Sequence, residues 1–202
     1  AELGPTDEGA ASRPPPDPTG PVLIHPGAGS LRKRWPLERF LALADRLRGS
    51  GRQVHFIVGP AEEDLLPELD GQKESVFRPS DLVELAARLR AAAAFIGNDS
   101  GVSHLAGWAG VPSVVIFGPS DPVRWRPNGR VVEVVQPPLA CRPCFEMAAE
   151  TCATAECMNA TRVADVLQAV ARVLPPIHET TRVSDGDRTQ AEGTGCRLRR
   201  LR

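Results

Sequence analysis

Tyrosine is absent from this 202-residue sequence, which excludes any mechanism that uses a tyrosine acid or nucleophile. An excess of positive charge is also absent, since 24 Lys and Arg are balanced by 25 Asp and Glu. The sequence therefore offers no basic field for nucleic acid or for anionic lipid. It shows no apolar run near the roughly 20 residues of a membrane span and no secretory leader. With 42% hydrophobic residues, the composition predicts a soluble, globular, intracellular protein.

The two ends of the chain differ from its middle in composition. Residues 1–21 are rich in proline and predict an extended linker. Residues 175–202 are polar and end in a basic run, so we expect a tail that is disordered or docked on a partner. The first residue is Ala1 and not Met, which leads us to expect a chain that is trimmed, excised or incomplete at its front. The folded domain is predicted to span residues 22–174.

Short apolar runs alternate with helical patterns through this central segment. Strands are predicted at 22–25, 54–58, 75–77, 93–97, 113–117 and 131–135. Helices are predicted at 36–49, 61–66, 82–89, 100–109 and 161–174. Strands alternating with helices at this spacing indicate a parallel sheet covered on both faces. The predicted fold class is therefore α/β, a single Rossmann-like domain with a parallel sheet of about six strands.

Ligands of such sheets bind at the carboxyl ends of the strands, so the loops there are the candidate binding segments. After the first strand, Gly27 and Gly29 let the backbone approach a ligand. Lys33 and the helix that starts near Pro36 both suit a phosphate group. The loop lacks the complete phosphate-loop pattern and the third glycine of a dinucleotide motif. A flexible, solvated turn is an equally good interpretation of this loop taken alone.

Three further loops carry unusual sequence. Glu62 follows the second strand, where an acid suits either a ribose hydroxyl or simply the start of a helix. Asp99 and His104 flank the start of the helix after the fourth strand, and their occurrence in one corner favours a binding site over a cap and a packed histidine. Gly-Pro and Asp-Pro pairs in 117–127 predict a shaped loop without regular structure. We expect the four loops to converge on one site.

Taken in order, these loops resemble glycosyltransferase family 9, the heptosyltransferases and relatives that build the lipopolysaccharide core of Gram-negative bacteria. The resemblance covers about residues 22–174 and implies the C-terminal, donor-binding half of a GT-B fold. The motifs that carry it are His25-Pro26-Gly27-Ala28-Gly29-Ser30, Lys33-Arg34-Trp35-Pro36, Gly59-Pro60-Ala61-Glu62, Gly97-Asn98-Asp99-Ser100-Gly101, His104-Leu105-Ala106 and Phe117-Gly118-Pro119-Ser120-Asp121-Pro122.

The resemblance also implies a role for each matching residue. Lys33 would neutralise the diphosphate of an ADP-sugar and Glu62 would hold its ribose. The residues expected to bind the donor are Gly29, Ser30, Lys33, Glu62, Asp99, Ser100, Gly101 and His104. Fixed amides and a lysine can stabilise a diphosphate leaving group, so no cofactor is expected for transfer. The D-x-D sequence at 185–187 lies in the polar tail and does not support metal-dependent transfer.

In a GT-B enzyme the catalytic base belongs to the acceptor half, and here only the Pro-rich linker precedes the first strand. We therefore expect no catalytic residue in this chain, and poor transfer without a partner half. The implied partners are an ADP-sugar and a lipid-linked saccharide acceptor, with a cytoplasmic location that includes the cytoplasmic face of the inner membrane. The alternative is a non-catalytic nucleotide-sugar-binding or partner-docking module left by loss of the acceptor half.

Four cysteines form a separate group within 17 residues, before the last predicted helix. This spacing favours a structural zinc or a cluster over disulfides. It is looser than the paired C-x-x-C of a zinc ribbon, and reduced thiols, or disulfides formed on purification, are an alternative of equal standing. The candidate ligands are Cys141, Cys144, Cys152 and Cys157.

Overall fold

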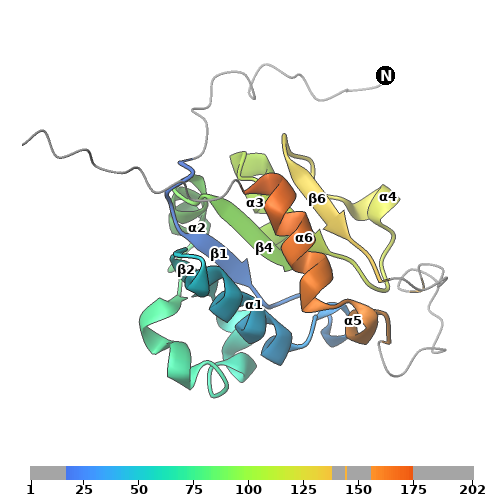
Figure 1. Cartoon of the computed structure of the whole chain (residues 1–202), viewed down its shortest axis with the longest axis horizontal. Coiled ribbons are helices and arrows are strands. Elements are labelled where there is room, and N and C mark those ends of the chain that lie inside the picture. The colour runs from blue at the N-terminus through green and yellow to red at the C-terminus, as the bar shows by residue number, and fades with distance from the viewer. Residues whose placement is uncertain (1–16, 138–143, 145–155, 175–202) are drawn as a thin grey trace, which may run out of the picture.

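The computed structural model describes residues 17–137, 144 and 156–174. Six strands form one sheet in the order β3-β2-β1-β4-β5-β6, and every neighbouring pair is parallel (Figure 1). The strands are β1 (Val22–His25), β2 (Val54–Ile57), β3 (Val76–Phe77), β4 (Ala94–Asn98), β5 (Ser113–Ile116) and β6 (Val132–Val135). The predicted parallel α/β sheet is therefore confirmed.

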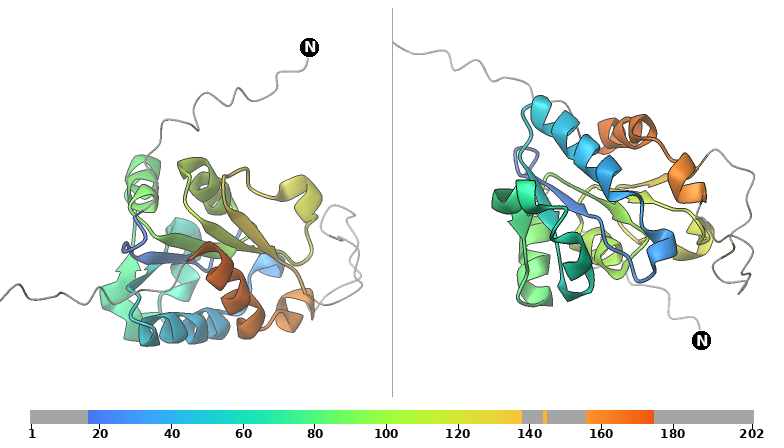
Figure 2. Two further views of the ribbon diagram at one scale, coloured as in Figure 1. Left: turned by 45° about the horizontal axis from the view of Figure 1, so that its top comes forward. Right: turned by 90° about the horizontal axis from the view of Figure 1, so that it is seen from below.

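Helices cover both faces of the sheet, as Figure 2 shows. Helices α1 (Leu37–Gly49) and α6 (Val163–Val173) pack on one face, and α2 (Leu82–Arg90) and α3 (Gly101–Ala109) on the other. Successive side chains of β1 point to opposite faces of the sheet and pack into two different hydrophobic cores. Val22 and Ile24 pack with α1 and α6, whereas Leu23 packs with α2 and α3. Because both faces are buried, the central strands consist of apolar runs without polar alternation.

Local capping fixes several helix ends where the sequence predicts them. The side chain of Asp81 accepts a hydrogen bond from the Glu84 backbone N–H at 2.8 Å and begins α2. Ser100 is the N-cap of α3, and Gly110 ends this helix with a φ of 83°, in the left-handed region that favours glycine. Such signals involve neighbouring residues only, so they can be seen before the fold is known.

The prediction of a loop without regular structure at 117–127 is wrong. It contains the one-turn helix α4 (Pro122–Trp125), because Asp121 accepts from the Val123 N–H and Pro122 occupies the first helical position, where no N–H is needed. The predicted 61–66 helix is a 3-10 helix, η3. The bounds of η3 are Pro60–Leu65. Three more elements were not predicted, namely η2 (Leu31–Lys33), η4 (Asp70–Ser75) and α5 (Glu156–Ala160).

The described part of the predicted linker is attached to the domain at the amino edge of the sheet. The Pro18 carbonyl accepts from the Arg52 guanidinium, and the Pro21 carbonyl accepts from the Ala93 N–H at 3.0 Å. The rest of the linker, residues 1–16, and the tail at 175–202 lie outside the described residues. Within the described ranges, no helix has both the length and the apolar character needed to cross a membrane.

Candidate functional site

The centre of the sheet contains the point at which the strand order reverses. From β1 the chain proceeds to β2 and β3 on one side, then returns to place β4 on the other side of β1. Connections that leave β1 and β4 therefore diverge at their carboxyl ends, where α/β proteins form a crevice for ligands. The loops after β1, β2, β4 and β5 all emerge at this edge (Figure 1).

The loop after β1 positions a lysine at this crevice. Ser30 caps η2 by accepting from the Arg32 backbone N–H at 3.3 Å, and Lys33 ends that short helix. Lys33 Nζ lies 3.1 Å from Oδ2 of Asp99, and only 15% of the lysine side chain is exposed. The predicted phosphate-binding lysine is therefore held by an ion pair between the loops after β1 and β4.

Asp99 joins three of the four loops. Besides Lys33, its Oδ2 accepts a hydrogen bond from the Ser120 hydroxyl at 2.6 Å, and its backbone N–H donates to the Ile116 carbonyl at 3.1 Å. The carboxylate is 7% exposed. The carboxylate thus has both a cation and a hydroxyl donor as partners. Ser120 was not among the predicted site residues, although its loop had been singled out.

The amino end of α3 adjoins Asp99. Ser100 accepts from the Ser103 N–H, and Gly101 is the first helical residue and is exposed. The free N–H groups and the positive end of a nine-residue helix thus lie beside Lys33 and Asp99, an arrangement that favours an anion. His104, one turn further along, is exposed.

Glu62 occupies the loop after β2 and is buried at 6% exposure. Its Oε1 lies 3.6 Å from Nε2 of His25, and its Oε2 accepts from the Gly59 N–H at 3.0 Å. The His25 imidazole, with smaller contributions from the Gly59 N–H and Arg34, lowers the pKa of Glu62 from its ordinary value against the opposing effect of burial. Glu62 is therefore an ionised acceptor at the carboxyl edge of the sheet.

Asn98, the last residue of β4, anchors the first loop and was also missed by sequence reasoning. Its Oδ1 accepts from the Trp35 backbone N–H at 3.0 Å, and its Nδ2 donates to the carbonyls of Pro26 and Gly27. The side chain is fully buried. Asparagine suits this position because it supplies an acceptor and two donors at once. The only available sequence signal was its place within the Gly97–Gly101 motif.

The structure thus brings most of the predicted donor-binding residues to one edge. Glu62 joins this group through His25, which lies in the first family motif but is not among the predicted site residues. Gly29 is exposed, and within the described structure no atom lies within 4 Å of the position that a Cβ would occupy there. Around the start of α3 lie Lys33, Asp99, Ser100 and Gly101, while Ser30 caps the short helix η2 that ends at Lys33.

Comparison with known proteins decides the family. The family model described as glycosyltransferase family 9 (heptosyltransferase) matches residues 7–153 of this chain, a segment that contains all four loops. The chain belongs to glycosyltransferase family 9.

Individual relatives are similar to a large part of this chain. Lipopolysaccharide heptosyltransferase 3 of Escherichia coli K12 is 32% identical over 113 residues, covering 52% of this chain and 33% of its own. A solved family 9 glycosyltransferase from Veillonella parvula is 26% identical, with a TM-score of 0.66 over 78% of this chain and 47% of its own. The E. coli heptosyltransferase WaaC, solved with ADP, is 21% identical, with a TM-score of 0.62 over 81% and 47% of the two chains.

The similarity covers only part of each relative's length. The chain spans about a third of the length of that curated relative and about half the length of the two solved chains. The six-stranded α/β domain matches GT-B heptosyltransferase structures over that half, so the predicted fold is confirmed in this respect as well.

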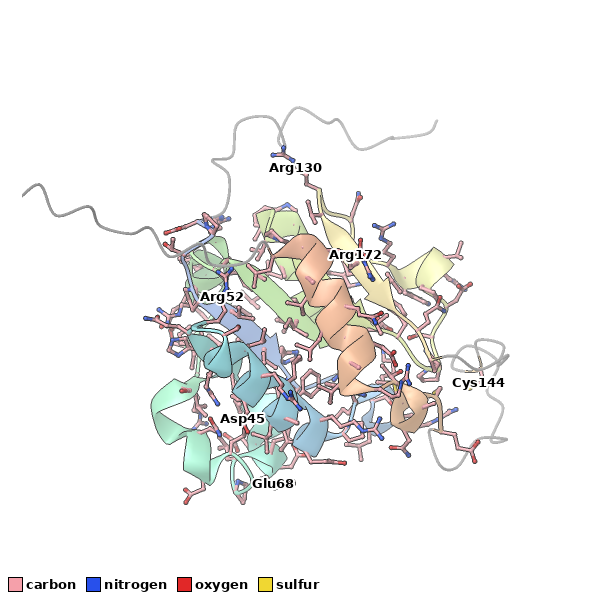
Figure 3. The ribbon with its side chains drawn as sticks, viewed as in Figure 1. Asp45, Arg52, Glu68, Arg130, Cys144 and Arg172 are labelled. Carbon is pink, nitrogen blue, oxygen red and sulfur yellow. The ribbon has the colours of Figure 1, made fainter. Side chains whose placement is uncertain are left out.

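Two of the four candidate metal-ligating cysteines of this family 9 chain lie among the described residues. Cys144 lies at the carboxyl edge of the sheet, opposite the edge that carries Arg130 (Figure 3). Its N–H donates to the Pro119 carbonyl at 2.8 Å, and its Sγ lies 3.3 Å from Nη2 of Arg32. Cys157 is buried in α5. Cys141 and Cys152 lie outside the described residues, and among the others no group of three or more ligating side chains is placed to hold a metal.

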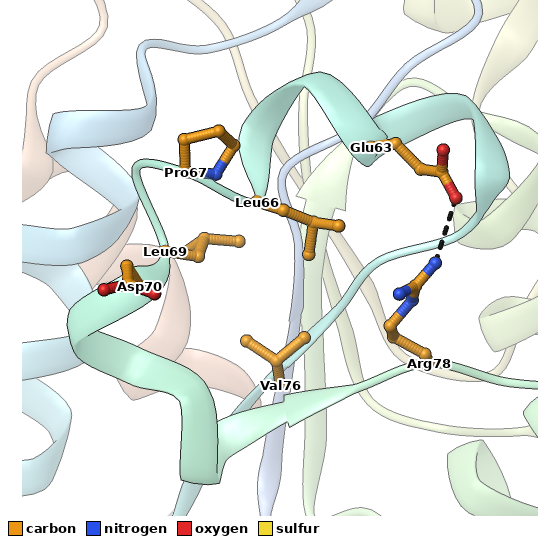
Figure 4. A pocket seen from close by; sticks show the side chains of 7 residues that line it. All are labelled: Glu63, Leu66, Pro67, Leu69, Asp70, Val76 and Arg78. Carbon is orange, nitrogen blue, oxygen red and sulfur yellow. Dashed lines mark hydrogen bonds and ion pairs between the residues drawn. The ribbon is translucent and has the colours of Figure 1, made fainter.

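A separate cavity of about 530 Å³ lies between η3, η4 and β3 (Figure 4). The side chains of Leu66, Leu69 and Val76 line it, and an ion pair of 3.0 Å between Glu63 and Arg78 crosses its rim. Glu63 faces this cavity, while the neighbouring Glu62 is buried against His25. The cavity is therefore distinct from the loop cluster around Asp99.

Proposed function

We propose that this chain binds an ADP-activated sugar as the donor half of an inverting GT-B glycosyltransferase that acts in synthesis of the lipopolysaccharide core or a related cell-envelope glycan. The observation that carries the proposal is the position of Lys33 beside Asp99 and the amino end of α3. The family 9 match and the heptosyltransferase names of the relatives support the same conclusion.

The proposed diphosphate site combines two sources of positive charge. Lys33 supplies a full charge, and the free amides of α3 supply the partial charges of a helix amino end. When a glycosidic bond breaks, negative charge develops on the leaving diphosphate. Groups that are already in place stabilise that charge without reorganisation. Lys33 and the amides would perform this task without a metal ion.

The proposed ribose contact falls to Glu62. An ionised carboxylate has about four acceptor positions, of which the Gly59 N–H and the His25 imidazole occupy two. Acceptor capacity is therefore left for the hydroxyls of a ribose. Asp99, Ser100 and Gly101 would bind the sugar and the phosphates from the adjacent loop, with Gly29 and Ser30 contributing backbone and hydroxyl contacts.

The proposed reaction also needs an acceptor and a catalytic base, which the donor site described above does not supply. A GT-B reaction takes place between two domains, so a second domain would bind the lipid-linked saccharide and supply the base. The site described above would then hold and activate only the donor. We propose that the complete enzyme acts at the cytoplasmic face of the inner membrane, and the lipopolysaccharide heptosyltransferase names of the relatives support this location. The sugar we propose is a heptose, as in those names.

Calorimetric titration with ADP tests the proposal, with UDP as the comparison nucleotide. We expect saturable binding of ADP that is at least several-fold tighter than binding of UDP. Lys33→Ala should weaken ADP binding, whereas Arg130→Ala, a loss of charge at the opposite edge of the sheet, should not (Figure 3). Absence of ADP binding by the 202-residue chain, or equal effects of the two substitutions, would overturn the assignment.

A further inference from the structure

His25 is a buried histidine that the proposed donor contacts do not use. It is the last residue of β1, the strand between β2 and β4, and 3% of it is exposed. Its Nε2 lies 3.6 Å from Oε1 of Glu62, and its Nδ1 lies 3.5 Å from the Ser100 hydroxyl. One imidazole thus contacts the loops on both sides of the crevice.

The Ser100 hydroxyl can accept from or donate to the imidazole, because Ser103 provides it with an alternative partner. The Ser103 hydroxyl donates to the Asn98 carbonyl, and its oxygen lies 3.2 Å from that of Ser100. In the neutral ring, the ionised Glu62 carboxylate can only accept, so Nε2 carries the proton that faces it and Nδ1 accepts from the Ser100 hydroxyl. In the charged ring, Ser100 donates to Ser103 instead, and both ring nitrogens donate. A donor faces Glu62 in either state.

The remaining surroundings leave Glu62 few alternative positions. Its Oε2 is bound by the Gly59 N–H, and a Cβ placed on Gly27 would lie only 2.2 Å from Oε1. The carboxylate is therefore enclosed by the loops after β1 and β2, and His25 is the group that contacts Oε1 from below the crevice. Without the imidazole, Oε1 would lose a donor and gain space in which to rotate.

We propose that His25 is a positioning residue, which fixes the Glu62 carboxylate for the ribose hydroxyls and thereby sets the preference of the site for ribonucleotides. This inference rests on the proposed function, since it explains how Glu62 would be held in position to contact the ribose of ADP. Orientation of an acceptor matters because a hydrogen bond weakens steeply with poor geometry. The expected consequence is a loss of hydroxyl discrimination with no loss of diphosphate binding.

The test compares ADP, 2′,3′-dideoxy-ADP and inorganic pyrophosphate by calorimetry on the 202-residue chain. The wild-type chain should bind ADP about tenfold or more tightly than dideoxy-ADP, the scale of a hydrogen bond to a charged group. His25→Leu should bring this ratio close to one and leave pyrophosphate affinity unchanged. His25→Gln, which can still present an N–H to Glu62, should restore most of the ratio.

Two additional variants keep the result decisive. His25→Asn retains a polar side chain that is too short to reach Glu62, so it should also reduce the ratio if His25→Leu fails to fold. His55→Leu is the matched control, because His55 is a half-buried histidine on the neighbouring strand β2. In a double variant, Glu62→Gln should cause no further loss of the ratio when His25 is already leucine.

Each outcome separates the inference from the proposed function. A ratio that persists in His25→Leu and His25→Asn, or an equal fall in ADP and pyrophosphate affinity, would show that His25 only packs the core. Wild-type binding of ADP without discrimination against dideoxy-ADP would overturn the role of His25 and leave the donor site in place. Failure of the wild-type chain to bind ADP would overturn both.

Discussion

Lys33 Nζ lies 3.1 Å from Oδ2 of Asp99, although 66 residues separate the two in sequence. The pair joins the loops after β1 and β4 across the reversal of strand order, and both side chains are largely buried. Their mutual attraction is screened less than that of a surface pair. The ion pair therefore holds the Lys33 ammonium in place before any phosphate binds. A bound phosphate would have to share this ammonium group with Asp99.

Replacing Lys33 by alanine should weaken ADP binding by about 1.5–3 kcal/mol, the range for a hydrogen bond to a charged group. The loss should fall on the diphosphate, so pyrophosphate affinity should decrease in the same proportion. Calorimetry with both ligands gives the measurement. An ADP affinity that does not change would remove Lys33 from the site.

Asp99→Asn should have different effects on the affinity for ADP and on the affinity for ADP-sugar. Asparagine keeps the size of the side chain and can still accept from Ser120, but it no longer holds Lys33 by charge. ADP affinity should therefore be maintained or increase, while affinity for the complete ADP-sugar should fall about tenfold through loss of a charged acceptor. Parallel decreases for both ligands, measured by calorimetry, would contradict a role for Asp99 in binding the sugar.

Two glycines of the first loop should respond differently to alanine. A Cβ on Gly27 would lie 2.2 Å from the Glu62 carboxylate, so Gly27→Ala should destabilise the domain by about 1–3 kcal/mol, as overpacking does. Gly29→Ala adds its methyl to open space and should change stability by less than about 0.5 kcal/mol. Denaturant unfolding of the pair checks this, and equal values would contradict the described position of Glu62.

The His25–Glu62 contact should make stability depend on pH in the acid range. The folded-state pKa of Glu62 lies below its ordinary value of 4.5, so folding favours the ionised form. Its contribution is present above pH 4.5 and is lost as the pH falls through the folded-state pKa. The stability difference between wild type and Glu62→Gln should therefore shrink as the pH decreases below about 4.5. Thermal melts at closely spaced pH values, with Glu63→Gln as an exposed control, measure it; a difference independent of pH would contradict the pairing.

The four-cysteine segment has its own test. Zinc held by Cys141, Cys144, Cys152 and Cys157 would contribute to folding, so chelation should lower the melting temperature of the purified chain. Elemental analysis should find about one metal ion per chain under that hypothesis. Cys196→Ser is the matched control, since Cys196 lies far from the four in sequence. Metal-free protein with an unchanged melting temperature would favour reduced thiols.

Much of the architecture could be predicted because it depends on neighbouring residues. Buried apolar runs separated by amphipathic segments indicate a parallel sheet, and Asp81 and Ser100 are recognisable helix caps. The short helix α4 was missed because its proline and aspartate were interpreted as interrupting regular structure, whereas here they begin a helical turn. The same residue types favour either outcome, and the surrounding structure determined which one occurred.

The sequence by itself determined the fold class, the order of the motifs and the edge of the sheet at which their loops meet. Only the tertiary structure decided which side chains contact one another. Because β1 lies between β2 and β4, His25 is buried between Glu62 and Ser100, while His104 is exposed on α3. Ser120 reaches Asp99 for the same reason, since β5 adjoins β4. Spacing along the chain cannot reveal such contacts, because they depend on the order in which the strands pair.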